Sequence, residues 1–131
     1  MKYLVMIYGN PKNWEHPMFL HDPGFLALPQ EERDEITRQA DEFWQEIHES
    51  GEFVAGVALA DPALTKNVRG RDGLPVITDG PYLEAKEQLA GYFVFDCESP
   101  ERAAELAARF PDARFAAVEV RPIMDMSGQE M

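Results

Sequence analysis

Basic residues, cysteines and long apolar runs are all scarce in this sequence. Its 131 residues include 12 Lys or Arg against 24 Asp or Glu, which gives a formal net charge of −12. This excess of carboxylates opposes direct contact with nucleic acid or anionic lipid, because both need clustered cations. The single cysteine, Cys97, cannot form an internal disulfide, and no segment reaches the about 18 consecutive apolar residues of a membrane span. We therefore expect a cytoplasmic protein that does not cross a membrane.

The length and composition fit one globular domain. A chain of 131 residues with 45% apolar content can bury a stable core without a metal or a disulfide. No internal repeat, low-complexity tract or linker divides the sequence. We predict a single domain over residues 1–125, followed by a frayed tail over residues 126–131.

Helix and strand patterns alternate along the chain. Two helices are predicted, from Pro29 to Gly51 and from Ser99 to Pro111, because apolar residues recur at helical spacing between a start and a stop signal. The predicted strands are residues 3–8, 53–59, 91–97 and 118–123, with a hairpin of residues 65–69 and 75–78. Residues 82–90 have weak helical character. Residues 9–28 form a long connection that contains three aromatic side chains, Trp14, Phe19 and Phe25.

This order of elements, β-α-β, a hairpin and then β-α-β, predicts a ferredoxin-like α+β sandwich, with both helices on one face of an antiparallel sheet. The first strand and residues 92–95 are nevertheless apolar on both sides. Two helices cannot cover both faces of a four-stranded sheet, so a second subunit or a large ligand must close the other face. We predict a twofold homodimer, with a small-molecule site in the cleft between the sheet and the elements that cover it.

The densest polar cluster follows a rigid turn within residues 78–87. Asp79 precedes a Gly-Pro pair, and a carboxylate fixed by such a turn at a strand end suits general-base work or hydrogen bonding to a ligand hydroxyl. A neighbouring lysine, Lys86, could keep this carboxylate ionised or bind an anionic substrate. The alternative is that Asp79 only starts a turn, while Glu84, Lys86 and Glu87 form a solvated surface.

Four separated motifs resemble those of the YCII-related superfamily, in its DGPF-domain branch. The most specific is TDGPYLEAKEQLAGYFVFD, residues 78–96, and the others are MKYLVMIYG, TKNVRGRDG and VEVRPIMD, in the expected order. The resemblance covers nearly the whole chain and implies a ferredoxin-like dimeric α/β barrel. Tyr82 stands where the branch name has Phe, a change that keeps the ring and adds a hydroxyl.

The resemblance also implies a chemistry. Some YCII-like proteins resemble small lyases, including a dehydrochlorinase that acts on chlorinated hydroxyhydroquinone, and a His–Asp pair in the cleft is their proposed catalytic element. The histidine of that pair lies within the first helix. Here the body of that helix carries Gln39 and Ala40, and its only histidine is His48 in the last turn, where the helix dipole favours an imidazolium.

Together, the polar cluster and the resemblance predict the site residues. Asp79 is the predicted catalytic base or hydroxyl acceptor, while Lys86 and Arg69 hold an anionic group. The residues predicted to bind the substrate are Lys86, Arg69, Glu84, Glu87 and Tyr82. We expect a small polar or aromatic metabolite and proton transfer, as in elimination or isomerisation, with no cofactor and no metal. Four aromatic residues could line a ring-binding cleft or simply pack in the core: Trp14, Trp44, Tyr8 and Tyr92.

Other interpretations stay open. His16 and His21, beside Glu15 and Asp22, could bind a divalent metal, although a loop packed over the core or closing the cleft is favoured. Residues 9–28 could cover their own subunit or its neighbour. DGPF-type proteins resemble domains fused to, or encoded beside, extracytoplasmic-function sigma factors, so the chain could be a non-catalytic accessory or regulatory protein with such a partner. It could also have kept the fold and lost the chemistry.

Overall fold

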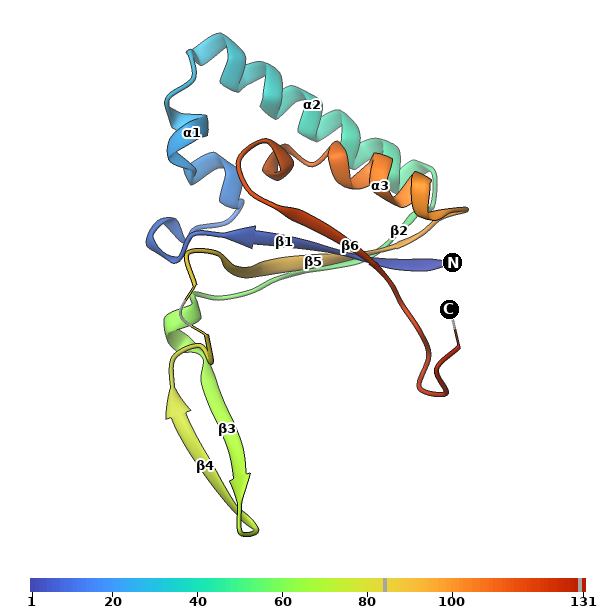
Figure 1. Cartoon of the computed structure of the whole chain (residues 1–131). Coiled ribbons are helices and arrows are strands. Elements are labelled where there is room, and N and C mark those ends of the chain that lie inside the picture. The colour runs from blue at the N-terminus through green and yellow to red at the C-terminus, as the bar shows by residue number, and fades with distance from the viewer. Residues whose placement is uncertain (84, 130) are drawn as a thin grey trace.

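The computed structural model describes residues 1–83, 85–129 and 131. A four-stranded sheet has the order β2-β5-β1-β6, and every neighbouring pair is antiparallel. Its strands are β1 (Lys2–Gly9), β2 (Phe53–Ala58), β5 (Gln88–Asp96) and β6 (Val118–Pro122). Helices α2 (Gln30–Glu49) and α3 (Pro100–Ala108) lie on one face of this sheet (Figure 1). The predicted α+β class is confirmed, and the topology is compatible with a ferredoxin-like fold.

The strand positions follow from the sequence pattern. Along β1 the side chains alternate between buried and half-buried, and Tyr3, Val5 and Ile7 are the buried set that faces the helices. The intervening residues, with their partners on β5, point away from the helices. We call this second surface the open face, and its apolar members on the two central strands are Leu4, Met6, Tyr92 and Val94. Strand β6 ends on Pro122 and lies at the sheet edge, where a residue without a backbone N–H is tolerated.

Both long helices begin at their predicted start signals and α2 ends as predicted, whereas α3 ends at Ala108, before the predicted stop at Pro111. Pro29 caps the N-terminus of α2, Glu31 and Glu32 occupy its first turn, and Gly51 follows its end with φ of 77°. In α3 the Ser99 hydroxyl accepts a hydrogen bond from the backbone N–H of Arg102 at 3.1 Å, and Pro100 takes the first helical position.

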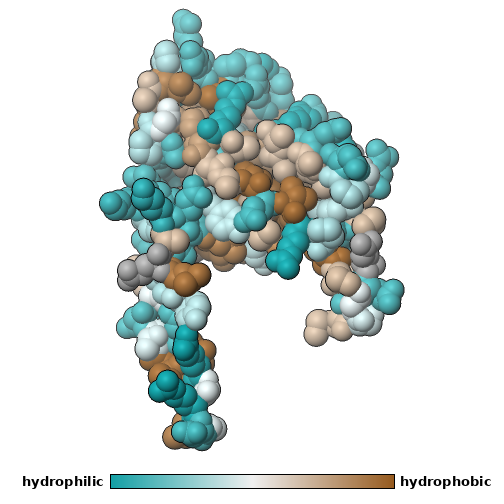
Figure 2. Space-filling view, viewed as in Figure 1, coloured by the Kyte–Doolittle hydropathy of each residue, from teal (hydrophilic) through white to brown (hydrophobic). Residues whose placement is uncertain are grey.

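A separate two-stranded ribbon is inserted between the two halves of the fold. Strands β3 (Lys66–Arg71) and β4 (Leu74–Asp79) pair in register around Asp72 and Gly73, which both have positive φ. The ribbon, which we call the arm, projects from the side of the sheet opposite the helices (Figure 1). Figure 2 shows the arm and the C-terminal segment as two projections below the body, with a hollow between them.

The predicted helical character of residues 82–90 is wrong. Among the described residues of this segment there is no helix, and β5 already begins at Gln88. Gly80 has φ of 90° and turns the chain, and Gln88 and Leu89 then pair with Gly9 and Tyr8 of β1. Sheet pairing therefore decides the local structure, because the backbone groups of residues 88–90 are used by the neighbouring strand.

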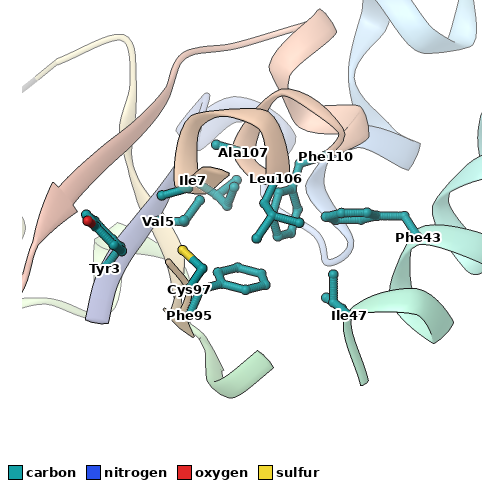
Figure 3. Close-up of a cluster of buried hydrophobic side chains, with 11 residues drawn as sticks. Tyr3, Val5, Ile7, Phe43, Ile47, Phe95, Cys97, Leu106, Ala107 and Phe110 are labelled. Atoms are coloured by element: carbon teal, nitrogen blue, oxygen red, sulfur yellow. The ribbon is translucent and has the colours of Figure 1, made fainter. Parts of the chain in front are cut away.

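The main core lies between the sheet and the two helices. Figure 3 shows side chains from β1, β5, α2 and α3 converging there, with the rings of Phe43, Phe95 and Phe110 against one another. The fully buried members include Tyr3, Val5, Phe95, Ile47 and Leu106. Each buried side chain of this size contributes about 1.5–3 kcal/mol to folding, so this cluster defines the helix-covered face of the sheet.

The long connection after β1 forms a second, smaller core. It contains two 3-10 turns (Pro11–Asn13 and Met18–His21) and a short helix α1 (Pro23–Leu26). Phe19 and Phe25 are buried against Ile36 of α2 and packed by Phe115. Residues 10–22, which we call the entry segment, are thereby fixed over one end of the sheet.

None of the helices in the described part of the chain combines the length and apolar character that a membrane span requires.

Candidate functional site

A cavity of about 380 Å³ lies between the sheet and helix α2. This volume is in the range of small-ligand pockets. We call it the ring cavity because aromatic rings form much of its wall. Its lining residues are Ile7, His16, Pro17, Met18, Trp44, Phe53, Gly56, Val57, Ala58, Ala90, Gly91, Phe93 and Asp112.

Three aromatic side chains from different elements form the apolar wall. Trp44 of α2 lies 5.1 Å from Phe53 of β2 and 6.1 Å from Phe93 of β5, measured between ring centroids. Trp44 is 46% exposed, so this wall is open to solvent at its rim. His48 stacks on Phe53 at 4.5 Å and donates through Nδ1 to the Trp44 carbonyl at 2.7 Å. His48 therefore contacts two rings of this wall, and it is not among the lining residues of the ring cavity.

Two glycines leave space on the side of the ring cavity that the sheet forms. A Cβ atom at Gly91 would lie 2.5 Å from the backbone oxygen of Val57, which cannot move without breaking the β2–β5 pairing. A Cβ atom at Gly56 would lie 2.8 Å from the Phe93 ring. Glycine at these positions lets the two strands approach and leaves room above them.

Asp112 is the acidic group of the ring cavity. It sits in the 3-10 turn Pro111–Arg114, directly after α3, and its side chain is half-buried. Burial raises the pKa of Asp112 to about 6, while hydrogen bonds to its own backbone N–H and to that of Phe19, and the charge of His16, act in the opposite direction. A carboxyl with this pKa exchanges protons readily near neutral pH, which is what general acid–base catalysis requires.

His16 lies beside Asp112 at the rim of the same cavity. Its exposed ring donates through Nε2 to the carbonyl oxygen of Leu59 at 2.7 Å, and its charge lowers the pKa of Asp112. The ring cavity therefore contains a histidine and an aspartate. His16 comes from the entry segment and Asp112 from the turn after α3. Neither comes from α2, the helix in which the resemblance placed a catalytic histidine.

A smaller polar cavity of about 190 Å³ adjoins the ring cavity, and Met18 and Asp112 line both. Two predicted site residues, Lys86 and Glu87, belong to it. The other polar groups of its wall are Tyr8, Asn10, Asn13 and Asp22. A hydrogen bond to the Glu119 carboxylate and burial raise the pKa of the Tyr8 phenol. Lys86 is thus placed where it can hold an anionic or hydroxyl group next to Asp112.

The remaining predicted site residues lie on the arm or next to it. Asp79 ends β4, its side chain is 78% exposed, and it forms an ion pair with Lys66 across the ribbon. The guanidinium of Arg69 lies over the ring of Tyr82, 4.9 Å from its centroid. The catalytic role of Asp79 and the substrate-binding roles of Arg69 and Tyr82 stay predictions, and Glu84 lies outside the described residues.

The two loop histidines do not share one site. His21 pairs with Glu15 at 3.5 Å, whereas His16 contacts Leu59. Within residues 1–83, 85–129 and 131, no group of three or more His, Cys, Asp or Glu side chains is arranged to hold a metal ion.

Asp112 and His16 were missed as a pair by sequence reasoning. An Asp after Phe-Pro is typical of the first turn of a short helix, and this is where Asp112 lies. Only the packing of the entry segment over that turn buries the carboxyl and brings His16 to it. No local signal in the sequence indicates that these two residues line the same cavity.

The fold and the two adjoining cavities define a small α+β protein with a ligand-sized cleft beside its longest helix. A family model of the YCII-related domain matches residues 1–127, so the chain belongs to the YCII-related family and the family predicted from the motifs is confirmed. It is similar to an uncharacterized protein of Rhizobium meliloti (strain 1021), with 28% identity over 99 residues, which are 74% of this chain and 80% of the relative. The narrower DGPF assignment and the sigma-factor partner stay predictions.

Proposed function

We propose that this protein is a homodimer that binds a small aromatic metabolite in the ring cavity and transfers a proton on it through Asp112. The observation that carries the proposal is a half-buried carboxyl, with its pKa raised to about 6, in the wall of an aromatic-lined cavity of about 380 Å³. A strongly perturbed titratable group in a cleft marks a functional-site candidate on physical grounds.

The ring cavity and the polar cavity offer different contacts, and together these contacts define the ligand class. Trp44, Phe53 and Phe93 offer stacking and edge contacts to a planar ring, since aromatic pairs favour such arrangements at about 4.5–7 Å. On the other side of Asp112, Lys86 offers a cation to a polar substituent. A phenol that also carries a carboxylate, or a second hydroxyl, matches both halves.

Asp112 acts as the base in this proposal because its pKa is close to neutral. It removes a proton from the bound ring or from a hydroxyl of the metabolite, and His16 at the rim balances the carboxylate charge. Return of the proton at another atom is an isomerisation, and departure of a leaving group is an elimination. In the single chain Asp79 is exposed and paired with Lys66, and for this reason the proposal rests on Asp112.

The homodimer is supported by the open face. Leu4, Met6, Tyr92 and Val94 form an apolar band there, and no helix among the described residues covers it. Two such faces packed at about 10 Å would bury both bands, in the way that sheets pack in sandwiches. A twofold axis makes the same surface serve both subunits.

Two probes and two variants test the binding site. The probes are 4-hydroxybenzoate and catechol, and binding is followed by the shift of the Trp44 indole N–H signal in NMR titrations. Asp112→Asn replaces the base by an amide side chain of nearly the same size, and Asp79→Asn is the matched control on the arm. We expect Asp112→Asn to raise the dissociation constant of both probes at least about fivefold, and Asp79→Asn to leave it within about twofold of the parent.

Lys86→Met sharpens the test. This variant is expected to weaken the binding of 4-hydroxybenzoate, which carries a carboxylate, and to leave the binding of catechol unchanged. If neither probe shifts the Trp44 signal, or if Asp79→Asn has the larger effect, the proposed site is wrong.

A further inference from the structure

The arm exposes an apolar surface that no described part of this chain covers. Register places Val68 opposite Ile77 and Gly70 opposite Pro75 on one side of the ribbon. Val68 is 65% and Ile77 is 62% exposed, and brown patches on the projecting arm are visible in Figure 2. We call this side the bare face of the arm.

The other side of the ribbon is turned toward the chain itself. Arg69 lies there and places its guanidinium over Tyr82, in the segment that leads back to the body. On this side Val76, opposite Arg69, is 43% exposed, while Leu74, next to the turn, is 70% exposed. The two faces of the arm therefore differ in their contacts outside the ribbon: the described residues give the bare face none, and its Lys66–Asp79 ion pair lies within the ribbon itself.

A two-stranded ribbon of this length is marginal in water by itself. Hairpins gain independent stability from a third strand or from packing on another element. Here the arm forms a separate two-stranded sheet, paired with no strand of the four-stranded sheet.

We propose that the bare face of the arm docks on a second copy of this chain, along the edge of the sheet of that copy. This inference rests on the homodimer proposed above and names a second contact in it. Six residues in each strand give an arm about 20 Å long, at about 3.4 Å for each residue. Two open faces packed together lie only about 10 Å apart, so an arm that projects from that side extends past the partner sheet.

Charge favours a second copy as the occupant. The chain carries a net charge of −12, so two copies repel each other at long range. The arm is an exception: Lys66 is paired with Asp79, and the remaining charges are Arg69 and Arg71, on the side opposite the bare face, against Asp72 at the turn. Its tip reaches the level of the partner's helices, and α2 carries eight acidic residues over Gln30–Glu49. A basic arm laid against an acidic body offsets part of the repulsion.

The test compares two faces of the same ribbon by analytical ultracentrifugation over a range of concentrations. Val68→Asp combined with Ile77→Asp places charges on the bare face, and Val76→Asp is the matched control on the opposite face. Val94→Asp, on the open face of the sheet, tests the dimer itself. We expect the bare-face double variant to raise the dimer dissociation constant at least about tenfold and the control to change it less than about threefold.

Amide hydrogen exchange of residues 66–79 in the unaltered protein gives an independent measurement. In a docked arm these amides exchange at least about tenfold more slowly at high protein concentration than at high dilution, because docking protects the ribbon. This comparison needs no substitution, so it holds even if a variant folds poorly.

The outcomes separate the two proposals. If Val94→Asp dissociates the dimer while the bare-face variant stays as tight as the parent, and exchange on the arm is independent of concentration, the arm does not dock and the sheet dimer stands. If the unaltered protein is a monomer at every concentration, both the dimer and the docked arm are wrong. Binding of catechol, measured separately, reports on the ring cavity and not on the docking of the arm.

Discussion

Trp14 and His16 donate to the same atom, the carbonyl oxygen of Leu59, at 3.1 and 2.7 Å. A carbonyl oxygen has two lone pairs and can accept both bonds. Leu59 is itself held to the sheet, since its N–H donates to the Ala90 carbonyl at 2.8 Å. This double contact ties the entry segment to the end of β2 and sets His16 at the rim of the ring cavity.

Removal of His16 is expected to raise the pKa of Asp112 above 6. The histidine charge lowers this pKa in the folded protein, so His16→Ala removes a favourable neighbour of the carboxylate. A carboxyl-carbon NMR titration of Asp112 measures the shift. Trp14→Phe removes one bond to Leu59 without removing a charge, and it serves as the control. A pKa that stays the same or falls in His16→Ala would contradict the expected coupling.

Asp112→Asn is expected to stabilise the protein at pH 7. Burial raises the pKa of Asp112 to about 6 in the fold, above its ordinary value, so the folded state holds this proton more tightly than the unfolded state. Ionisation of the carboxyl therefore costs stability, and this cost develops as the pH rises from about 4 to about 6. We expect the variant to be more stable by about 1–3 kcal/mol at pH 7 and close to the parent at pH 4.

Chemical denaturation at the two pH values measures this difference. Asp41→Asn, on an exposed position of α2, is the matched control and is expected to change stability by less than about 0.5 kcal/mol at both. A carboxyl that destabilises the fold at neutral pH is typical of a functional position, because stability there is secondary to activity. Equal stability of Asp112→Asn and the parent at pH 7 would remove this argument.

Gly56→Ala is expected to weaken binding in the ring cavity. The new Cβ atom would meet the Phe93 ring at 2.8 Å, so the ring must move within a cavity that it lines. We expect catechol to bind at least about fivefold more weakly, with a loss of stability of about 1–2 kcal/mol from the displaced ring. Gly70→Ala on the arm, where nothing lies within 4 Å, is the matched control and should leave catechol binding unchanged.

The ion pair between Glu52 and Arg102 is expected to make the free energy of unfolding depend on pH in the acidic range. Both guanidinium bonds measure 2.9 Å, and they join α3 to the residue before β2. Hydrogen bonding from Arg102 lowers the pKa of Glu52 in the fold, so its stabilisation is present above the ordinary pKa of a glutamate and is lost as the pH falls through the lowered value.

Arg102→Met should therefore cost about 1–2 kcal/mol at pH 7 and much less near pH 3, as measured by denaturation at both values. Arg114→Met is the control, because the guanidinium of Arg114 donates to the neutral side chain of Gln39 at 3.4 Å. A cost that is the same at the two pH values would show that Arg102 acts by packing alone.

Most of the fold was predictable because its signals are local. Pro29 and Gly51 bound one helix, Ser99 and Pro100 start the other, and Asp72-Gly73 turns the arm. The segment after Pro81 was predicted less well, since pairing of Gln88 and Leu89 with β1 overrides a weak helical pattern. The polar cluster was recognised, yet its members separate in space: Lys86 and Glu87 reach the polar cavity, while Asp79 remains on the arm.

The amino-acid sequence alone determined the order of the main elements and the family, because these depend on residue type at short spacing. The tertiary structure decided which acid has an unusual pKa and which histidine stands beside it. Proton affinity depends on the water and the charges that surround a group, and these come from segments far apart in the chain. For that reason Asp112, unremarked in the sequence, became the centre of the candidate site when the entry segment folded over it.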